Sequence, residues 1–132
     1  MEKKIKKECL FEILLTKLKE MQHVTRVYIG KTNDIDKRAQ EHEQKDGLAH
    51  TVEIAYGDPK VISEAEKILI KKFKDYKDID EVSWKLSNKS DGGEGNSDAS
   101  ILYISYDYDC STMKCDADVN DDELDIDSYE LN

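Results

Sequence analysis

The residue types best suited to chemistry lie in the sequence VYIGKT at residues 27–32 and in the segment that follows it. Alternate residues of a strand point to opposite faces, so Tyr28 and Gly30 share one face. Arg38 and His42 are four residues apart, which places them on one face of a helix. A phenol, a glycine that permits close approach, a guanidinium and an imidazole gathered in this way would form a cradle for a phosphate group.

A carboxylate falls on the apolar stripe of a helix predicted over about residues 60–76. At about 100° per residue, Ile62, Leu69 and Phe73 define this stripe, and Glu66 lies within it. A buried carboxylate is costly unless a neighbouring group compensates it. Glu66 could lie at the rim of the core or pair with a buried Arg or Lys. Alternatively, it faces a pocket and holds a divalent cation, because such cations prefer oxygen ligands.

The elements that must position these residues follow from hydrophobic periodicity and turn chemistry. An N-terminal helix over residues 3–21, with apolar positions at Ile5, Cys9, Ile13 and Leu14, is favoured over a buried strand at 9–16. The capping side chains of Thr32-Asn33-Asp34 open a second helix. The remaining elements are expected to be strands at 24–30, 51–56 and 101–106, helices at 34–45 and 60–76, and a glycine-containing loop at 87–98. That loop lacks the Lys-Ser/Thr of a P-loop, so a nucleotide site of that kind is not expected.

The net charge of −10 is concentrated at one end of the 132-residue chain. Residues 107–132 contain ten acidic side chains and one basic one, which leaves −1 for residues 1–106. We therefore expect one domain over 1–106 and a flexible acidic tail over 107–132. The tail would be a solubilising appendage, or it would compete with DNA for basic residues as a tethered inhibitor.

The three cysteines and the absence of a long apolar run bear on the compartment of the protein. An odd number of cysteines without a secretory signal predicts an intracellular protein, cytoplasmic or nuclear, with free thiols. Cys110 and Cys115 resemble half of a zinc site, but no second pair follows, so a metal role for them is not expected. No segment approaches the length of a membrane span.

In the order and spacing of these residues, the chain resembles the GIY-YIG nuclease family. The stretch YIGKT with Arg38 and His42 is similar to the second half of the family signature. Residues 66–73, with their leading glutamate, resemble the metal-binding helix, and residues 87–96 resemble the closing Asn/Gly-rich segment. The resemblance covers about residues 24–97.

The resemblance implies a small α/β (α+β) fold with a mainly antiparallel three-stranded sheet flanked by helices. It also implies hydrolysis of phosphodiester bonds with one divalent cation, Mg²⁺ or Mn²⁺. Glu66 would bind the cation, Arg38 would hold the scissile phosphate, and Tyr28 would orient or deprotonate the attacking water. His42 would be an alternative acid–base group and Asn88 a supporting positioner.

The expected partner is nucleic acid, DNA in preference to RNA, contacted by Lys31 and Lys89 together with Arg38. One departure from the family pattern concerns catalysis. The family opens with a Gly-Ile-Tyr strand whose tyrosine is a usual candidate general base, whereas residues 12–21 contain neither Gly nor Tyr. Two rival hypotheses follow: a catalytically degenerate module of the same fold that binds nucleic acid or protein, and an interaction protein that uses its N-terminal helix and acidic tail.

Overall fold

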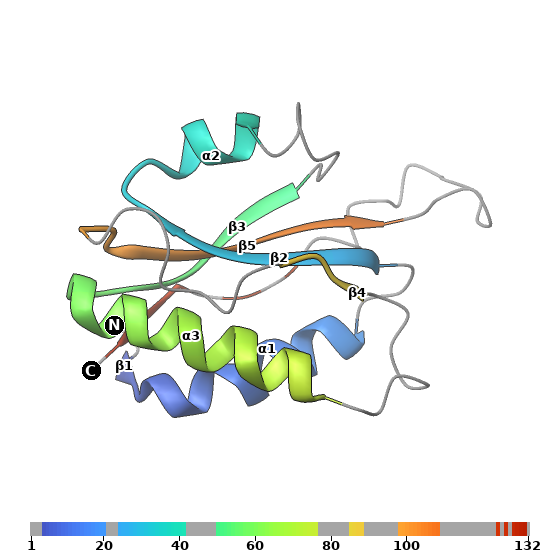
Figure 1. The fold of residues 1–132 in the computed structure, drawn as a ribbon, viewed down its shortest axis with the longest axis horizontal. Helices are drawn as coiled ribbons and strands as arrows, with labels where there is room; N and C mark the ends of the chain where they lie inside the picture. Colours follow the sequence, from blue (N-terminus) through green and yellow to red (C-terminus); the bar gives the residue numbers. More distant parts are fainter. Residues whose placement is uncertain are drawn as a thin grey trace.

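The computed structural model describes residues 4–20, 24–41, 50–76, 85–88, 98–108, 124, 126 and 128–131, which form helices on both faces of one sheet (Figure 1). Its elements in chain order are β1 (Lys4–Ile5), the 3₁₀ turn η1 (Lys7–Cys9), α1 (Leu10–Glu20), β2 (Val24–Thr32), α2 (Ile35–Glu41), β3 (His50–Tyr56), α3 (Pro59–Asp75), β4 (Lys85–Leu86), β5 (Ile101–Tyr108) and β6 (Tyr129–Leu131).

The sheet has six strands in the order β1-β6-β3-β5-β2-β4. Its centre, β3-β5-β2, is antiparallel and corresponds to the three predicted strands. The prediction of a three-stranded sheet is nevertheless wrong, because β1, β6 and β4 extend the sheet through parallel pairings. These added strands are two or three residues long, too short for an alternating hydrophobic pattern to mark them in the sequence.

The helix predicted over 3–21 is confirmed for α1, Leu10–Glu20, which excludes the strand that competed with it over 9–16. The prediction is wrong for its first turns, because Lys4–Ile5 form the strand β1 and Lys7–Cys9 the turn η1. Leu10, Leu14 and Leu18 are buried, and their spacing of four residues forms the core-facing stripe of α1. Cys9, predicted to contribute apolar surface, is exposed as a free cysteine. It lies in the turn η1, before the helical period of α1 begins, which accounts for this error.

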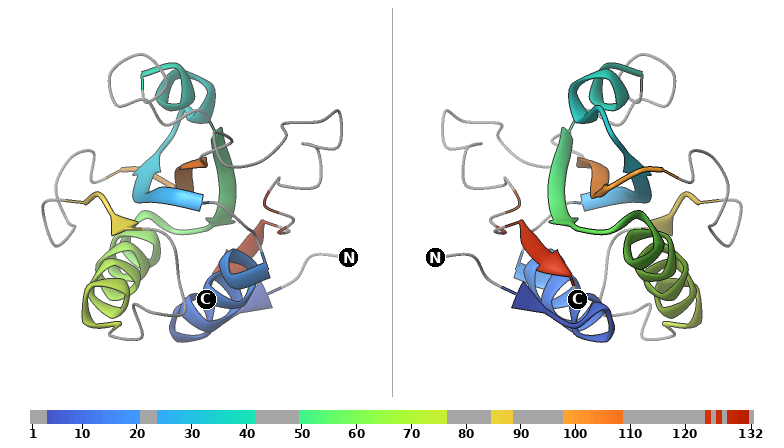
Figure 2. Two further views of the ribbon diagram at one scale, coloured as in Figure 1. Left: turned by 90° about the vertical axis from the view of Figure 1, so that its right-hand side faces the viewer. Right: turned by 90° about the vertical axis from the view of Figure 1, so that its left-hand side faces the viewer.

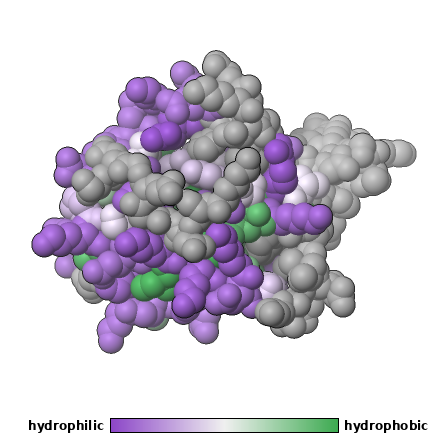
Figure 3. Space-filling view, viewed as in Figure 1, coloured by the Kyte–Doolittle hydropathy of each residue, from purple (hydrophilic) through white to green (hydrophobic). Residues whose placement is uncertain are grey.

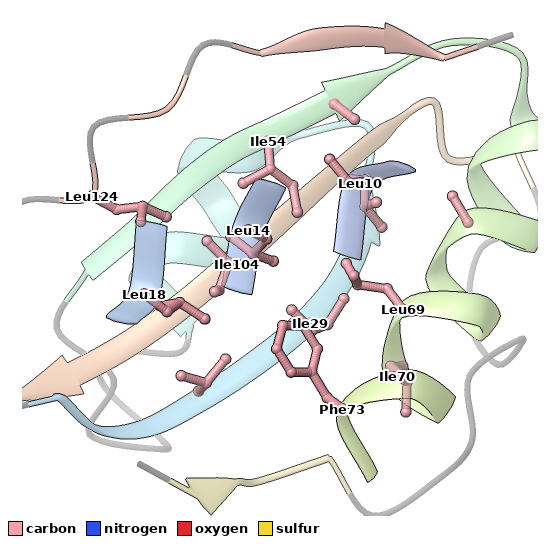
Figure 4. Packing of buried hydrophobic residues seen from close by; sticks show 14 of the residues in the cluster. Leu10, Leu14, Leu18, Ile29, Ile54, Leu69, Ile70, Phe73, Ile104 and Leu124 are labelled. Atoms are coloured by element: carbon pink, nitrogen blue, oxygen red, sulfur yellow. The ribbon is translucent and has the colours of Figure 1, made fainter. Parts of the chain in front are cut away.

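The core lies between the sheet and the layer formed by α1 and α3, whereas α2 covers the opposite face (Figures 1 and 2). Leucines of α1 pack with Ile29, Ile54 and Ile104 of the three central strands, and α3 contributes Leu69, Ile70 and Phe73 (Figure 4). Phe11 and Phe73 pack edge to face, with ring centroids 4.8 Å apart. This continuous apolar layer fixes α3, and with it Glu66, against the sheet.

Part of the acidic tail belongs to the sheet. β6 pairs with β3 and β1, and the side chains of Leu124 and Leu131 are buried in the core. The Leu124 amide donates a hydrogen bond to the Tyr106 hydroxyl at 3.0 Å. The expectation of a tail that packs no apolar surface is therefore wrong for these residues, because two leucines spaced among the carboxylates supply enough apolar contact. β5 also continues two residues past the predicted boundary, to Tyr108.

None of the helices in the described ranges combines the length and the apolar character that are needed to cross a lipid bilayer.

Candidate active site on the polar face of the sheet

The two faces of the central strands differ in chemistry. In the antiparallel register, Tyr28 lies opposite Ser105 and Gly30 opposite Tyr103, so these four residues share one face. The opposite face carries the apolar residues that pack on α1 and α3. The first face is polar: the hydroxyls of Thr51 and Ser105 are 2.7 Å apart. It is covered by α2, a seven-residue helix in which no residue is buried. A polar sheet face that is covered, in the described part of the chain, only by one short helix without buried residues is better suited to bind a polar group than to form a hydrophobic core.

Tyr103 is the residue around which this face is organised. Its side chain is only 2% exposed, and its ring lies tilted against that of Tyr28, with centroids 6.3 Å apart. The phenol lies over Gly30, because a Cβ added at Gly30 would come within 2.5 Å of the Tyr103 Cζ. Gly30 is therefore required for close approach, as its place in the motif predicts, and the approaching group is a tyrosine from β5.

The ionisation of Tyr103 connects residues that are remote in the sequence. Burial raises the pKa of the Tyr103 hydroxyl well above its ordinary value, and the neighbouring Tyr28 raises it further. The Arg38 guanidinium lowers this pKa, whereas the carboxylates of Glu66 and Glu41 raise it. Tyr28, Arg38 and Glu66, from β2, α2 and α3, thus all lie within electrostatic reach of one hydroxyl. The phenol therefore remains protonated at neutral pH.

Glu66 is buried on α3, as the helical period predicts. Its side chain is 5% exposed within the row of residues that faces the sheet. The helix begins at Pro59, and the Asp58 carboxylate caps it by accepting the Lys60 amide at 2.9 Å. Because the apolar neighbours of Glu66 fix the orientation of the helix, its carboxylate is held on the inner side of α3.

Arg38 is brought to the site by the turn that links β2 to α2. Asp34 caps α2 by accepting the Lys37 amide at 3.1 Å, which confirms the predicted capping. The predicted helix over 34–45 is observed as α2, Ile35–Glu41, and its predicted continuation lies outside the described residues. The Arg38 guanidinium contacts the Glu41 carboxylate at 3.2 Å and is partly exposed, with 42% of its side-chain surface accessible. A partly exposed guanidinium with one carboxylate neighbour retains donors for a phosphate.

Asn88 acts on the backbone of β2. Its side-chain oxygen accepts the Ile29 amide at 2.9 Å, and its side-chain nitrogen donates to the Ile29 carbonyl at 2.8 Å. This pair of bonds continues the pairing of β4 with Arg26 and Val27 two residues further along β2, at Ile29. Asn88 therefore holds the strand that carries Tyr28 and Gly30.

Lys31 points to the opposite face of β2 from Tyr28. Its side chain is 7% exposed, and its Nζ donates to the Ser63 hydroxyl on α3 at 2.8 Å. It thus links the end of β2 to the first half of α3. The predicted site residues His42 and Lys89 lie outside the described residues, as does most of the glycine-containing loop.

The sequence analysis missed Tyr103. Its segment was predicted correctly as a strand, but a tyrosine in an alternating strand is most often a half-buried packing residue. The signal that identifies it is the antiparallel register that sets it opposite Gly30, and pairing between strands 73 residues apart is not visible in local patterns. Once β5 is known to pair with β2, the register places Tyr103 opposite Gly30, and the missing side chain at Gly30 explains where the Tyr103 ring fits.

The described residues contain no group of three or more His, Cys, Asp or Glu side chains that could hold a metal ion. A single buried carboxylate still fits one class of cation: Mg²⁺ keeps several waters and is usually bound through one or two carboxylates plus phosphates of the substrate. Glu66, with its two carboxylate oxygens and its electrostatic reach to the Tyr103 hydroxyl, fits a site of that kind and does not fit a closed zinc site.

Neither a scan against protein-family models nor searches of curated proteins and solved structures finds a match to this chain.

Proposed function

We propose that this protein is a metal-dependent endonuclease that hydrolyses phosphodiester bonds in nucleic acid, DNA in preference to RNA. The observation that carries the proposal is the packing of Tyr28 against Tyr103 over Gly30 on the polar face of the sheet, under the helix that carries Arg38. Glu66 of α3, on the other side of the sheet, lies within electrostatic reach of the same Tyr103 hydroxyl. A carboxylate for a cation, a guanidinium for a phosphate and a phenol for a water are the groups that phosphodiester hydrolysis requires.

Each side chain has a role that its surroundings support. Arg38, partly exposed on α2, would donate hydrogen bonds to the oxygens of the scissile phosphate. Tyr28, half-buried on β2, would accept a hydrogen bond from the attacking water and orient it or take its proton. Tyr103 would stay neutral and donate its proton in a hydrogen bond, because burial and nearby carboxylates oppose its ionisation.

Glu66 would hold a single divalent cation, Mg²⁺ or Mn²⁺, through its carboxylate oxygens. When bound, such an ion supplies positive charge to the phosphate oxygens. The proposal draws support from the burial of this carboxylate on a helix whose other inward residues are apolar. A buried carboxylate that binds a cation offsets a desolvation cost that would otherwise destabilise the fold.

Tyr103 also bears on the departure from the GIY-YIG pattern. The segment at 12–21, where the pattern has its first strand and tyrosine, belongs largely to α1 in this chain. β5 pairs with β2 in antiparallel fashion and carries a tyrosine beside Tyr28. We infer that the strand missing before β2 is supplied after α3, from the C-terminal part of the chain. An intracellular location, cytoplasmic or nuclear, is part of the same proposal.

Nicking of supercoiled plasmid DNA tests this function. We expect conversion to the open circle in the presence of Mg²⁺ or Mn²⁺, and loss of conversion in EDTA. Glu66→Gln and Arg38→Ala should each reduce the rate at least about a hundredfold, the size of effect usual for removing one electrostatic contributor.

Two neighbouring residues supply matched controls. Glu64→Gln changes an exposed carboxylate on α3, and Lys37→Ala changes an exposed cation on α2. Both should leave nicking within about threefold of the wild-type rate, since surface charges contribute little. Wild-type rates in Glu66→Gln, or no metal-dependent nicking by the wild-type chain, would overturn the endonuclease proposal.

One observation favours the second candidate function, a module of the same fold that binds nucleic acid without cleaving it. Arg38 already contacts Glu41, a carboxylate that a phosphate would have to compete with. Binding of DNA that depends on Arg38, with no cleavage under any metal condition, would support this module. An interaction protein that uses its N-terminal helix and acidic tail would show neither activity.

A further inference from the structure

A stripe of lysines runs along the outer side of α3. Lys60, Lys67, Lys71 and Lys74 are all exposed, and at about 100° per residue they fall within about 60° of one another around the helix. From Lys60 to Lys74 the stripe is about 21 Å long, because each residue advances the helix by about 1.5 Å. The surface over α3 is largely hydrophilic (Figure 3).

Other contacts define the two flanks of this lysine stripe. Lys72 points away from it toward α1, with its Nζ 5.7 Å from the centre of the Phe11 ring. Glu64, on the same flank, is paired with Lys7 of η1, which offsets its charge. On the other flank lies Ser63, which accepts the hydrogen bond from Lys31. The buried Lys31 therefore connects this flank of the stripe to β2.

The flank with Ser63 is the one that leads to Glu66. Around the helix, Ser63 lies between the lysine stripe and the buried carboxylate, at about 100° per residue. Lys31 is the residue after Gly30, the glycine covered by the Tyr103 phenol. The Lys31–Ser63 hydrogen bond thus joins the helix that carries the lysine stripe to β2, the strand that carries Tyr28 and Gly30 on its other face.

We propose that the exposed side chains of Lys60, Lys67, Lys71 and Lys74 form a track that binds the phosphate backbone of DNA. In a chain with a net charge of −10, four exposed ammonium groups along one helix, against the exposed carboxylates of Asp75 and the paired Glu64 on one flank, are a local excess of positive charge. One DNA strand carries a phosphate about every 3.4 Å of helix axis, so a track of about 21 Å spans about six phosphates. Contacts of this kind position a duplex without reading its sequence. The inference deepens the proposed function, on which its biological meaning rests.

Salt dependence of DNA binding tests the track without any cleavage. A fluorescent duplex of about 20 base pairs is titrated in EDTA over a range of salt concentrations, with the full-length chain. The variant Lys67→Gln/Lys71→Gln/Lys74→Gln should bind at least about tenfold more weakly at low salt. The slope of log K against log salt should become shallower by about 2 to 3, since each lost phosphate contact contributes about 0.9.

The control variant Lys6→Gln/Lys17→Gln/Lys85→Gln removes the same charge from positions off the track. It should keep the wild-type slope, and circular dichroism should report native helix content in both variants. Equal slopes for the two triple variants, or no binding of the duplex by the wild-type chain, would overturn the track. A shallower slope only in the track variant, together with no nicking by the wild-type chain, would keep the track and reject the endonuclease.

Discussion

Gly30 and Tyr103 illustrate how two residues can be matched across a sheet. The ring of Tyr103 occupies the space that a side chain at position 30 would need, with Cζ 2.5 Å from an added Cβ. Gly30→Ala should therefore force the phenol or the strand to move, at a cost of about 1 to 3 kcal/mol in the free energy of unfolding. Urea denaturation of the single variant measures this cost.

A double-mutant cycle separates this clash from the general cost of changing a strand glycine. In a Tyr103→Leu background the ring is absent, so Gly30→Ala should cost at least about 1 kcal/mol less than in the wild-type chain. If the two substitutions are additive, the ring does not limit position 30 and the assignment of the glycine to close approach is wrong.

The raised pKa of Tyr103 makes a prediction about alkaline stability. In the unfolded chain the phenol ionises near its ordinary pKa of about 10, whereas in the folded chain it holds its proton to higher pH. The unfolded state thus binds fewer protons above about pH 10, and stability falls as pH rises. The decline should be smaller in Tyr103→Phe. Urea denaturation of both proteins from pH 8 to pH 11 checks it, and parallel curves would contradict it.

At the residue scale, local sequence patterns predicted the position of some functional groups and could not predict that of others. The burial of Glu66 follows from its position in a helical period, and the capping role of Asp34 follows from its place before a helix. Tyr103 required the partner strand, because antiparallel register joins residues that no local pattern compares. The hydrogen bonds of Asn88 to the backbone of β2 are equally non-local, since they span 59 positions.

At the scale of elements, the longer segments were predictable and the short ones were not. α1 and α3 have helical periods of several turns, and β2, β3 and β5 have enough residues to alternate. β1 and β4 are two residues long and exist only because neighbouring strands offer them unpaired backbone groups. β6 could not be recognised among the acidic residues around it, although Leu131 within the strand and Leu124 before it are buried in the core.

β6 holds β1 in the sheet, since β1 has no other strand partner among the described residues. Leu131→Ala removes a side chain that is buried at this junction and should cost about 2 kcal/mol, at the lower end for Leu→Ala substitutions. Amide hydrogen exchange of Lys4 and Ile5 should accelerate, whereas that of Ile104 in the central strand should change only with global stability.

The neighbouring residue Glu130 provides the control for this prediction. Its carboxylate pairs with Lys4 at 3.2 Å on the surface, so Glu130→Gln should cost less than about 1 kcal/mol. Unchanged exchange at Lys4 and Ile5 in Leu131→Ala would show that β1 is held by contacts other than β6.

At the scale of the whole molecule, charge and structure divide the chain at different places. The sequence places nearly all of the negative charge after residue 106, but the last strand of that segment completes the sheet. Deleting 107–132 to test an inhibitory tail would therefore also remove buried leucines and β6. A test of the acidic segment must therefore remove its negative charge and leave β6 in the sheet.

Neutralising six carboxylates between β5 and β6 meets this requirement. Changing each Asp to Asn and the Glu to Gln takes the net charge from −10 to −4 and leaves Leu124 and β6 intact. The repulsion between the chain and DNA falls, so the association rate should rise severalfold at low salt, while the dissociation rate changes little. The gain in association rate should vanish above physiological salt, where the Debye length is below about 8 Å.

Stopped-flow binding with a labelled duplex measures both the association rate and the dissociation rate. A slower dissociation at low salt would instead indicate that the acidic segment competes with DNA for the lysine track directly. The positions to change are Asp109, Asp116, Asp118, Asp121, Asp122 and Glu123.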